Sequence, residues 1–202
     1  QDGATIGALA VGCGTYSGET GDDITVGESP FYISPVGNEF ASGAEFDPFA
    51  SMYVAFEMTE PGDTIYVLPG TYSGDYNQEI SANNHDLTII GTGSVDETLF
   101  ELTSQFISFS NGSDGTIQNI TLTGGSNNNT AIMASTSSSY PQVLTLDNCK
   151  FLDMNMRVLY LTDYITANIS NCVFGGNTYN SLGTAIRIGN NNTVNLSGCL
   201  FY

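Results

Sequence analysis

The amino-acid sequence predicts an all-β chain that folds as a right-handed parallel β-helix. The first observation is a seven-residue phrase with an apolar second position, Asn or Gly at the fourth position and, in all copies but the first, an apolar seventh position. Its copies begin at Thr88, Thr116, Thr145, Asn168 and Asn195, so successive starts lie 28, 29, 23 and 27 residues apart. The second observation is that no helical pattern separates the copies. A repeat of about 27 residues is typical of a solenoid in which each repeat forms one coil.

The columns of this repeat have a physical interpretation. The core is expected to contain the second and seventh positions, which are Ile89, Ile117, Leu146, Ile169, Leu196 and Leu122, Phe151, Phe174, Phe201. The fourth position holds Gly91, Asn119, Asn148, Asn171 and Gly198. Because Gly and Asn tolerate a positive φ, this column predicts a left-handed bend between two short strands. We expect the Asn side chains to bond to one another along the stack.

The fifth position is expected to point inward and holds Thr92, Ile120, Cys149, Cys172 and Cys199. The three cysteines therefore share one column, with neighbours about 4.8 Å apart. This spacing lies within the Cα range of a disulfide. The alternative is a ladder of buried free thiols that pack as small hydrophobic groups, and we favour it.

A second set of apolar segments follows the same spacing, at residues 105–109, 130–133, 157–161 and 184–188. Short strands separated by turns rich in Gly, Asn and Ser also suit a β-sandwich. A sandwich does not require the same residue classes to return in register. We therefore prefer the parallel β-helix.

The charge balance excludes some partners. The chain has 21 acidic residues against Lys150, Arg157 and Arg187, and its formal net charge is −18. Nucleic acid is not an expected partner, because phosphate binding needs Lys and Arg. Anionic membrane surfaces are disfavoured for the same reason. No apolar run of 18 residues is present, so we expect no membrane span.

From Pro30 onward the chain resembles a known family. Residues 31–38 (FYISPVGN), 47–52 (DPFASM) and 60–72 (EPGDTIYVLPGTY) are similar to the opening of pectin-lyase-like β-helix proteins. The resemblance covers about residues 30–93, and the repeats extend it to the end. It implies the fold but not one function, since the family includes polysaccharide lyases, surface adhesins and other exported proteins. We divide the chain into an N-terminal extension, residues 1–29, and a β-helix, residues 30–202.

The two ends of the predicted β-helix differ. A short capping helix is expected over residues 48–59, with Asp47 as N-cap, Pro48 at the first helical position, and apolar residues at three- and four-residue spacing. No comparable cap follows Phe201, so we expect further polypeptide or another subunit to cover the last coil. The apolar segment Ala4–Val11 is a candidate strand for docking on a neighbouring subunit, which would build head-to-tail filaments.

No catalytic residue is assigned. The resemblance implies that a lyase would need a Lys or Arg base, with calcium on the substrate carboxylate. Arg157 and Arg187 lie on corresponding strands of successive coils and are expected on one face, where we interpret them as surface charges. For a hydrolase, no glycosidase motif contains Asp147, Asp153 or Asp163. The only histidine, His85, is interpreted as a turn residue.

No cofactor is expected apart from calcium. The candidates for hard oxygen ligands are Asp22, Asp23, Glu45 and Asp47, which match no defined calcium loop. A solvated acidic surface is the alternative that we favour.

N-glycosylation sequons are frequent in the chain. The expected acceptors are Asn111, Asn128, Asn168, Asn191 and Asn195. Asn119 also has a sequon, but its column places it in the Asn ladder. A composition rich in Asn, Ser and Thr produces sequons by chance, which is the alternative explanation.

The function expected from these observations is structural or surface-interacting, in an extracellular or cell-surface glycoprotein that self-associates through its ends. The alternative is a calcium-dependent polysaccharide lyase, or a carbohydrate-binding protein, that acts on acidic polysaccharide. The scarcity of basic residues favours the first function, whereas a cleft lined by Arg157 and Arg187 would favour the second.

Overall fold

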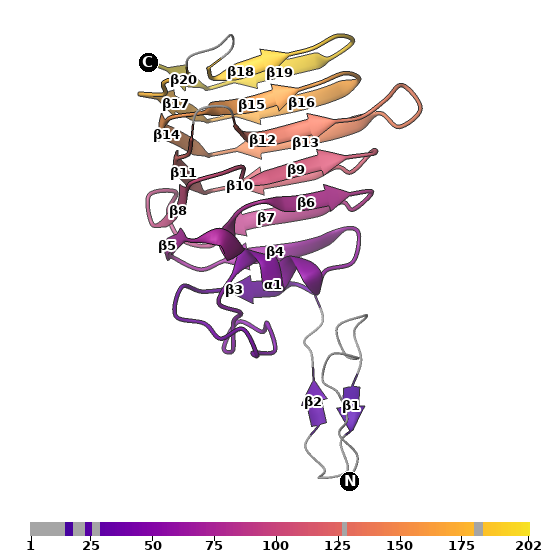
Figure 1. Ribbon diagram of the computed structural model, residues 1–202, viewed down its shortest axis with the longest axis vertical. Coiled ribbons are helices and arrows are strands. Elements are labelled where there is room, and N and C mark those ends of the chain that lie inside the picture. Colours follow the sequence, from indigo (N-terminus) through magenta and orange to yellow (C-terminus); the bar gives the residue numbers. More distant parts are fainter. Residues whose placement is uncertain (1–14, 18–22, 26–28, 127–128, 180–183) are drawn as a thin grey trace.

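A computed structural model describes residues 15–17, 23–25, 29–126, 129–179 and 184–202 (Figure 1). Three sheets of parallel strands wind around one core as a right-handed parallel β-helix, which confirms the predicted fold class. Within residues 1–29, β1 (Thr15–Ser17) and β2 (Asp23–Thr25) pair with each other in antiparallel fashion. The proposed docking segment, Ala4–Val11, lies outside the described residues, as do Cys13, Asp22 and Asn128.

The three sheets follow one another around each coil. The seven-stranded sheet contains β3 (Phe31–Ile33), β4 (Asp63–Val67), β7 (Leu87–Gly91), β10 (Gly115–Gln118), β13 (Gln142–Asp147), β16 (Ile165–Ser170) and β19 (Thr193–Ser197). The six-stranded sheet contains β5 (Gly70–Ser73), β8 (Thr98–Leu102), β11 (Thr121–Gly124), β14 (Lys150–Met154), β17 (Val173–Gly175) and β20 (Leu200–Phe201). The five-stranded sheet contains β6 (Ile80–Asn83), β9 (Ile107–Ser110), β12 (Thr130–Ser135), β15 (Arg157–Leu161) and β18 (Ile186–Ile188).

Neighbouring strands of the seven-stranded sheet pair at equivalent positions of the sequence repeat. The first positions of the phrase pair in order, from Thr88 through Thr116, Thr145 and Asn168 to Asn195. The predicted alignment of all five copies is therefore confirmed. Because each coil places equivalent residues above one another, one apolar column becomes a continuous stripe of core.

The inner columns form this core. Ile89, Ile117 and Leu146 are fully buried, and the seventh-position rings stack, with centroids 4.9 Å apart for Phe151 and Phe174. Exposure rises only in the last described coil, where Leu196 is 51% exposed. Among the described residues, no helix is long and apolar enough to cross a membrane.

The bend column has the expected backbone conformation in four of its five copies. The φ angles are 60° at Asn119, 50° at Asn148, 54° at Asn171 and 64° at Gly198. Asn148 Nδ2 donates to Asn119 Oδ1 at 2.8 Å, so this pair forms one step of an Asn ladder. The next step differs, because Asn171 Nδ2 donates at 3.0 Å to Asp147 Oδ1.

The prediction was wrong for the first copy of the bend. Gly91 remains in β7, paired with Val67 of β4, and its φ is not in the left-handed region. A Cβ at residue 91 would lie 2.1 Å from the carbonyl oxygen of Asn119, so glycine is needed there for close approach. Thr92 is exposed and begins a longer connection to β8, instead of pointing into the core.

The capping helix is shorter than predicted. Helix α1 spans Met52–Glu57, and its N-cap is Ser51, whose side chain accepts from the backbone N–H of Val54 at 3.4 Å. Residues 47–50 are not helical, because Phe49 N–H donates to the Tyr32 carbonyl and bridges β3. The predicted N-cap, Asp47, instead accepts from Ser42 N–H at 2.8 Å. The helix still covers the first coil, since Met52 and Ala55 are fully buried.

Candidate functional site

On the outer face of the five-stranded sheet, the type of side chain in one column changes from coil to coil. Successive strands place the following side chains in register: Ser81, Ser108, Met133, Tyr160 and Arg187. Each of these side chains is at least partly exposed, while their neighbours on either side in the central strands face the core. The column runs from small hydroxyl groups near the cap to an aromatic and a cationic group at β15 and β18.

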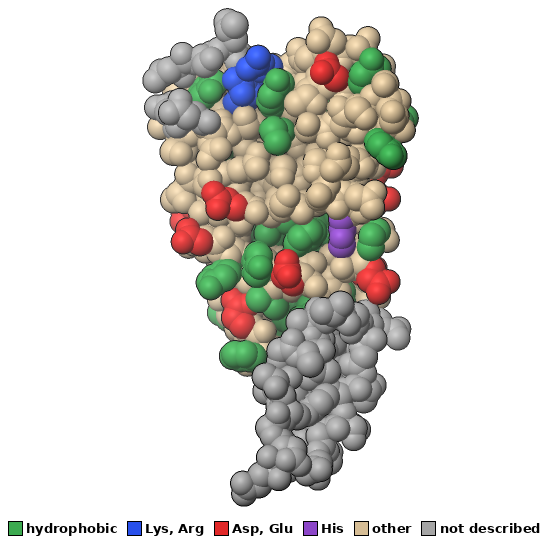
Figure 2. Space-filling model, turned by 45° about the vertical axis from the view of Figure 1, so that its right-hand side comes forward, with side chains coloured by type: hydrophobic (Ala, Val, Ile, Leu, Met, Phe, Trp, Pro, Cys, Tyr) green, Lys and Arg blue, Asp and Glu red, His purple; other side chains and the backbone are tan. Residues whose placement is uncertain are grey.

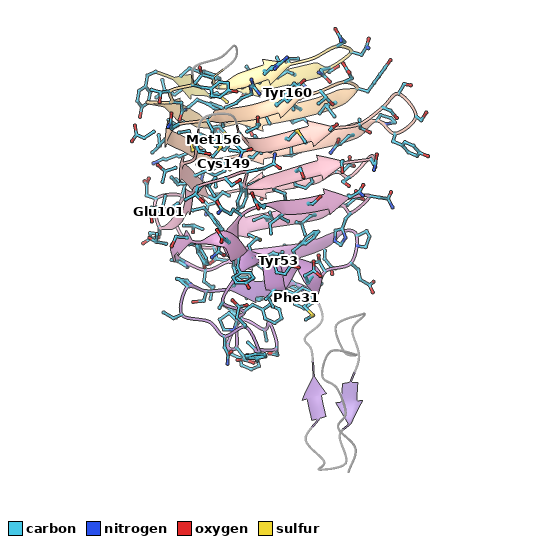
Figure 3. All side chains as sticks on the ribbon, in the orientation of Figure 1. Phe31, Tyr53, Glu101, Cys149, Met156 and Tyr160 are labelled. Carbon is cyan, nitrogen blue, oxygen red and sulfur yellow. The ribbon has the colours of Figure 1, made fainter. Side chains whose placement is uncertain are left out.

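Two basic residues and two tyrosines meet at the β15–β18 end of this column. The guanidinium carbon of Arg187 lies 4.7 Å from the Tyr160 ring centroid, and that of Arg157 lies 5.3 Å from the same centroid. Arg157 also lies 4.9 Å from the ring of Tyr179, which belongs to the connection between β17 and β18. We call these four residues the Arg–Tyr cluster. On the face drawn in Figure 2, the visible Lys and Arg side chains gather in one patch at the end of the solenoid opposite the cap, and Figure 3 labels Tyr160.

The two arginines of the cluster have different environments. Arg157 is only 6% exposed, and its Nη1 donates to Thr130 Oγ1 at 3.3 Å. Its buried guanidinium packs against the rings of both Tyr160 and Tyr179. Arg187 is exposed. An arginine that already rests on an aromatic ring has lost part of its conformational freedom, and its outward N–H groups remain able to bind a carboxylate.

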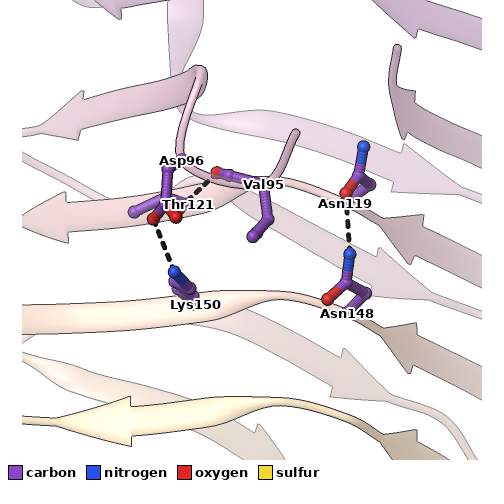
Figure 4. A network of polar contacts seen from close by, with 6 residues as sticks. All are labelled: Val95, Asp96, Asn119, Thr121, Asn148 and Lys150. Atoms are coloured by element: carbon purple, nitrogen blue, oxygen red, sulfur yellow. Dashed lines mark hydrogen bonds and ion pairs between the residues drawn. The ribbon is translucent and has the colours of Figure 1, made fainter. Parts of the chain in front are cut away.

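Lys150 is remote from this cluster and is paired. It begins β14 in the six-stranded sheet, where its Nζ lies 2.5 Å from Asp96 Oδ1. Figure 4 shows this ion pair beside the hydrogen bond from Thr121 Oγ1 to the Val95 carbonyl and the Asn119–Asn148 contact. The pair ties the β7–β8 connection to the strand two coils further on. Lys150 thus has a structural role in this arrangement.

The other catalytic candidates are dispersed. Asp147 Oδ1 accepts from Ser170 Oγ at 2.6 Å, and Asp163 Oδ1 accepts from Asn190 N–H at 2.7 Å. Asp153 lies in β14, at a φ of 51°. His85 follows β6, with Nε2 2.9 Å from Thr59 Oγ1 and its ring 5.0 Å from that of Phe56. Each of these residues is placed by local packing or a turn, and they do not converge on one point with the Arg–Tyr cluster.

The calcium candidates lie in different settings. Glu45 is exposed, and Asp47 closes the turn to Ser42. Asp23 belongs to β2, and Asp22 is outside the described residues. Within the part of the chain that the structure describes, no group of three or more His, Cys, Asp or Glu side chains is arranged to hold a metal ion.

The described sequon residues differ in how their amides are engaged. Asn119 Nδ2 donates to the carbonyl oxygens of Gly91, at 2.7 Å, and Gly93. Asn111 is exposed in a turn at a φ of 56°, although its Nδ2 donates to Asn83 Oδ1 at 2.6 Å. Asn195 Nδ2 donates to Asn168 Oδ1 at 2.9 Å on the outer face. Asn191 lies in an exposed turn.

Comparison with known proteins supports the fold. No family model matches the chain, and no curated protein matches it in sequence. The solved structure of a rhamnogalacturonan lyase is similar, with a TM-score of 0.58 and 16% identity over 85% of this chain and 51% of the lyase. The chain has the pectin-lyase-like fold. A crystal structure of a pectate lyase also matches, with a TM-score of 0.36 and 15% identity over 79% of this chain and 57% of that one.

The chain spans about half the length of both solved structures. At this level of identity the likeness concerns the fold alone, so the pectin-lyase-like architecture does not assign an activity. The function must therefore be argued from the residues that this chain carries on its coils.

Sequence reasoning identified half of the Arg–Tyr cluster. The predicted proximity of Arg157 and Arg187 is present, since both guanidinium groups lie within 5.3 Å of the Tyr160 ring centroid. The interpretation of Arg157 as a surface charge was wrong, because its side chain is only 6% exposed. Tyr160 could have been found from the alternation in residues 157–161, where it is the outward position between Leu159 and Leu161. Tyr179 lies in a long connection between repeats, and periodicity carries no signal for its position.

Proposed function

We propose that the protein is an extracellular surface-interaction β-helix that binds acidic carbohydrate through the Arg–Tyr cluster. The observation that carries this proposal is that two of the three basic residues of a chain with net charge −18 converge on one tyrosine ring. Scattered surface charges would have no reason to meet in this way. The rest of the acidic surface repels polyanions, so the cluster is the site at which a carboxylate gains most from binding.

The chemistry of the cluster suits a sugar acid. The guanidinium of Arg187 can donate two parallel hydrogen bonds to one carboxylate. The partly exposed rings of Tyr160 and Tyr179 offer apolar surface, together with hydroxyl groups that donate and accept hydrogen bonds. Ser108 and Ser81 continue the same column toward the cap and can bond to sugar hydroxyls. A bound polysaccharide would thus lie on the outer face of the five-stranded sheet, parallel to the solenoid axis.

The proposal is binding without cleavage. An elimination requires a base beside the proton that leaves the sugar ring. Lys150 is on another sheet and is paired with Asp96, while Arg157 is buried under the tyrosine rings. Arg187 alone is both basic and exposed, and it is placed to bind the carboxylate. Whether calcium takes part in binding is tested in the same experiment.

The test is a binding measurement with polygalacturonate as the acidic probe and dextran as the neutral control. We expect the protein to bind polygalacturonate, Arg187→Ala to bind at least tenfold more weakly, and Arg187→Lys to recover only part of the loss. Each reaction is run with calcium and with EDTA, and the ultraviolet absorbance of unsaturated product is followed. Equal affinity of the wild type and Arg187→Ala would contradict the binding site. Unsaturated product that disappears in Arg187→Ala would instead establish a lyase.

A second candidate function is self-association, and a specific observation favours it. The coil formed by β18, β19 and β20 exposes the apolar side chains of Ile188, Leu196, Leu200 and Phe201. Beside it lies an open surface pocket of about 350 Å³ lined by Phe174, Phe201 and Tyr202, among others. A second copy that adds a strand here would make a head-to-tail contact. Sedimentation should show concentration-dependent assembly that Leu200→Glu abolishes, and a monomer at every concentration would contradict it.

N-glycosylation is part of the extracellular proposal. Asn111 and Asn191 lie in exposed turns, where the fold leaves most room for a glycan. The Asn119 amide instead donates to two carbonyl oxygens. Glycopeptide mapping of protein secreted from a eukaryotic host should find sugar at Asn111 and Asn191 and none at Asn119. Occupancy of Asn119 with Asn111, Asn168, Asn191 and Asn195 bare would contradict it.

A further inference from the structure

The connection between β3 and α1 carries the three most exposed large apolar side chains of the described residues. We call residues 34–48 the cap loop, because they lie at the end of the solenoid that α1 covers (Figure 1). Val36 and Phe40 are each 91% exposed, and Phe46 is 92% exposed. Single exposed apolar residues are common on protein surfaces, but three in one loop indicate an interaction surface.

The cap loop is held in a defined conformation by backbone hydrogen bonds. Gly43 N–H donates to the Asp47 carbonyl at 3.0 Å, and Asn38 N–H donates to the Pro48 carbonyl at 3.1 Å. The loop is also fixed to the first strand, because Tyr32 N–H in β3 donates to the Gly43 carbonyl at 2.7 Å. The backbone therefore keeps the apolar side chains of the loop in water, where a partner can reach them.

The opposite end of the solenoid has an apolar surface of its own. The coil of β18, β19 and β20 leaves Leu200 55% exposed and Phe201 46% exposed. The open surface pocket beside this coil is lined by aromatic rings and by Asn177, Thr184 and Ala185. Its volume of about 350 Å³ leaves room for an aromatic side chain.

The two ends also differ in charge. Residues 34–63 contain no basic residue, and their acidic residues are Glu39, Glu45, Asp47, Glu57, Glu60 and Asp63. Residues 164–202 contain no Asp or Glu, and their only charged side chain is that of Arg187. Two cap loops would repel each other, whereas a cap loop and the coil that carries Arg187 are complementary in charge. The charges therefore favour a contact between unlike ends.

We propose that the cap loop is the surface through which one copy of this chain docks on the coil of β18, β19 and β20 of a second copy. Phe40 and Phe46 supply the apolar centre of the contact, and the acidic side chains of the loop form a rim beside Arg187. This inference rests on the proposed self-association and names the surface that the second copy contributes to it. Because unlike ends meet, the contact is heterologous, and each added copy leaves one head and one tail free.

The test uses variants that each remove one end of the contact. The head variant is Phe40→Ser/Phe46→Ser, and the tail variant is Leu200→Glu. The head variant should unfold at the temperature of the wild type, since both rings are in water. Tyr140→Ser is the matched control, because Tyr140 is 61% exposed but lies between β12 and β13, midway along the solenoid. Sedimentation velocity over a range of concentrations measures association.

We expect Tyr140→Ser to associate like the wild type and the head variant to associate about tenfold more weakly or worse. The decisive sample is an equimolar mixture of the head variant and the tail variant. At a concentration where neither associates alone, the mixture should form a 1:1 dimer and nothing larger. The intact tail of the head variant then binds the intact head of the tail variant, which a contact between like ends does not allow.

The charge complementarity is tested at Glu45, which is exposed in the cap loop. Glu45→Lys and Glu101→Lys change the net charge equally, but Glu101 is exposed in β8, outside the cap loop. Glu45→Lys should weaken association about threefold relative to Glu101→Lys. Equal association of the two variants would overturn the complementarity on which the choice of partner rests.

Three further outcomes would overturn the proposal. Unchanged association of the head variant would show that another surface docks, while self-association itself would stand. Loss of association on deletion of residues 1–14, with the head variant unaffected, would assign docking to the N-terminal segment. A wild type that is monomeric at every concentration would overturn both this inference and the proposed self-association. Polygalacturonate binding by the head variant is measured in parallel and reports separately on the Arg–Tyr cluster.

Discussion

Two sides of the same coil differ in how strictly they are built. At the bend between the seven-stranded and six-stranded sheets, the last four connections are two residues long, and each begins with Asn or Gly at positive φ. At the connections between the six-stranded and five-stranded sheets, the length varies from two residues before β15 to ten before β18. The bend side sets the register of the coils, and the connection side is free to carry residues such as Tyr179.

The difference teaches where mutations should be tolerated. A residue on the bend side contacts equivalent residues in the coils on either side of it, so a substitution there disturbs the Asn ladder or the aromatic stack. A residue on the outer face of the five-stranded sheet has solvent on one side and can change without opening the core. Stability should therefore depend on the bend side, and binding should depend on the outer face.

The largest effect is expected from the aromatic stack beside the bend. Phe151→Ala should lower the free energy of unfolding by about 3–5 kcal/mol, because it leaves a cavity under Phe174. The matched outer residue is Tyr160, and Tyr160→Ala should cost only about 1 kcal/mol, since its ring is partly exposed. Urea denaturation measures both, and equal losses would remove the distinction between the two sides.

The bend itself should be the next most sensitive position. Asn148→Val should cost about 2 kcal/mol, because a β-branched residue is placed at positive φ and the bond to Asn119 is lost. Asn148→Gly keeps the backbone conformation and should cost less. The same denaturation experiment compares them, and identical losses for Val and Gly would show that backbone conformation is not what the column selects.

A pH effect is expected from Tyr72, whose ring stacks on Phe100 nearer the cap in the same sheet. Burial raises the pKa of Tyr72, whose hydroxyl donates to the carbonyls of Leu68 at 2.7 Å and Ile33 at 3.0 Å. The unfolded chain loses this proton at about pH 10 and the folded chain does not. The stabilisation is thus complete below pH ~10 and falls above it by about 1.4 kcal/mol per pH unit, until the raised pKa is reached.

The control for this effect is Tyr72→Phe, which removes the titrating group but keeps the ring stacked on Phe100. Its unfolding free energy should fall less steeply between about pH 10 and 11.5 than that of the wild type. Parallel curves for the two proteins would mean that Tyr72 ionises equally in the folded and unfolded states.

The smallest effect on stability is expected from the exposed arginine. Arg187→Ala should change the free energy of unfolding by no more than about 0.5 kcal/mol. Its affinity for polygalacturonate should nevertheless fall at least tenfold, since a hydrogen bond to a charged group contributes about 1.5 kcal/mol or more. A variant that loses stability and binding together would place Arg187 among the residues that hold the fold.

The repeated phrase by itself determined the fold class, the register of five coils and the left-handed bend at Asn119, Asn148 and Asn171. It could do so because each coil packs on a copy of itself, so that the residue class needed at one level is needed at the next. The same logic predicted that Arg157 and Arg187 would lie near each other, and both guanidinium groups lie beside the Tyr160 ring. It did not predict that Arg157 would be buried.

Only the tertiary structure decided the features that are not repeated. Pairing of Phe49 with β3 delays the capping helix to Met52, and the close approach of the Asn119 carbonyl explains Gly91. Tyr179 reaches Arg157 through a connection whose path is set by what it packs against. The physical reason is that periodicity specifies contacts between equivalent residues of neighbouring coils, whereas caps and long connections make contacts that occur once and depend on the whole surface around them.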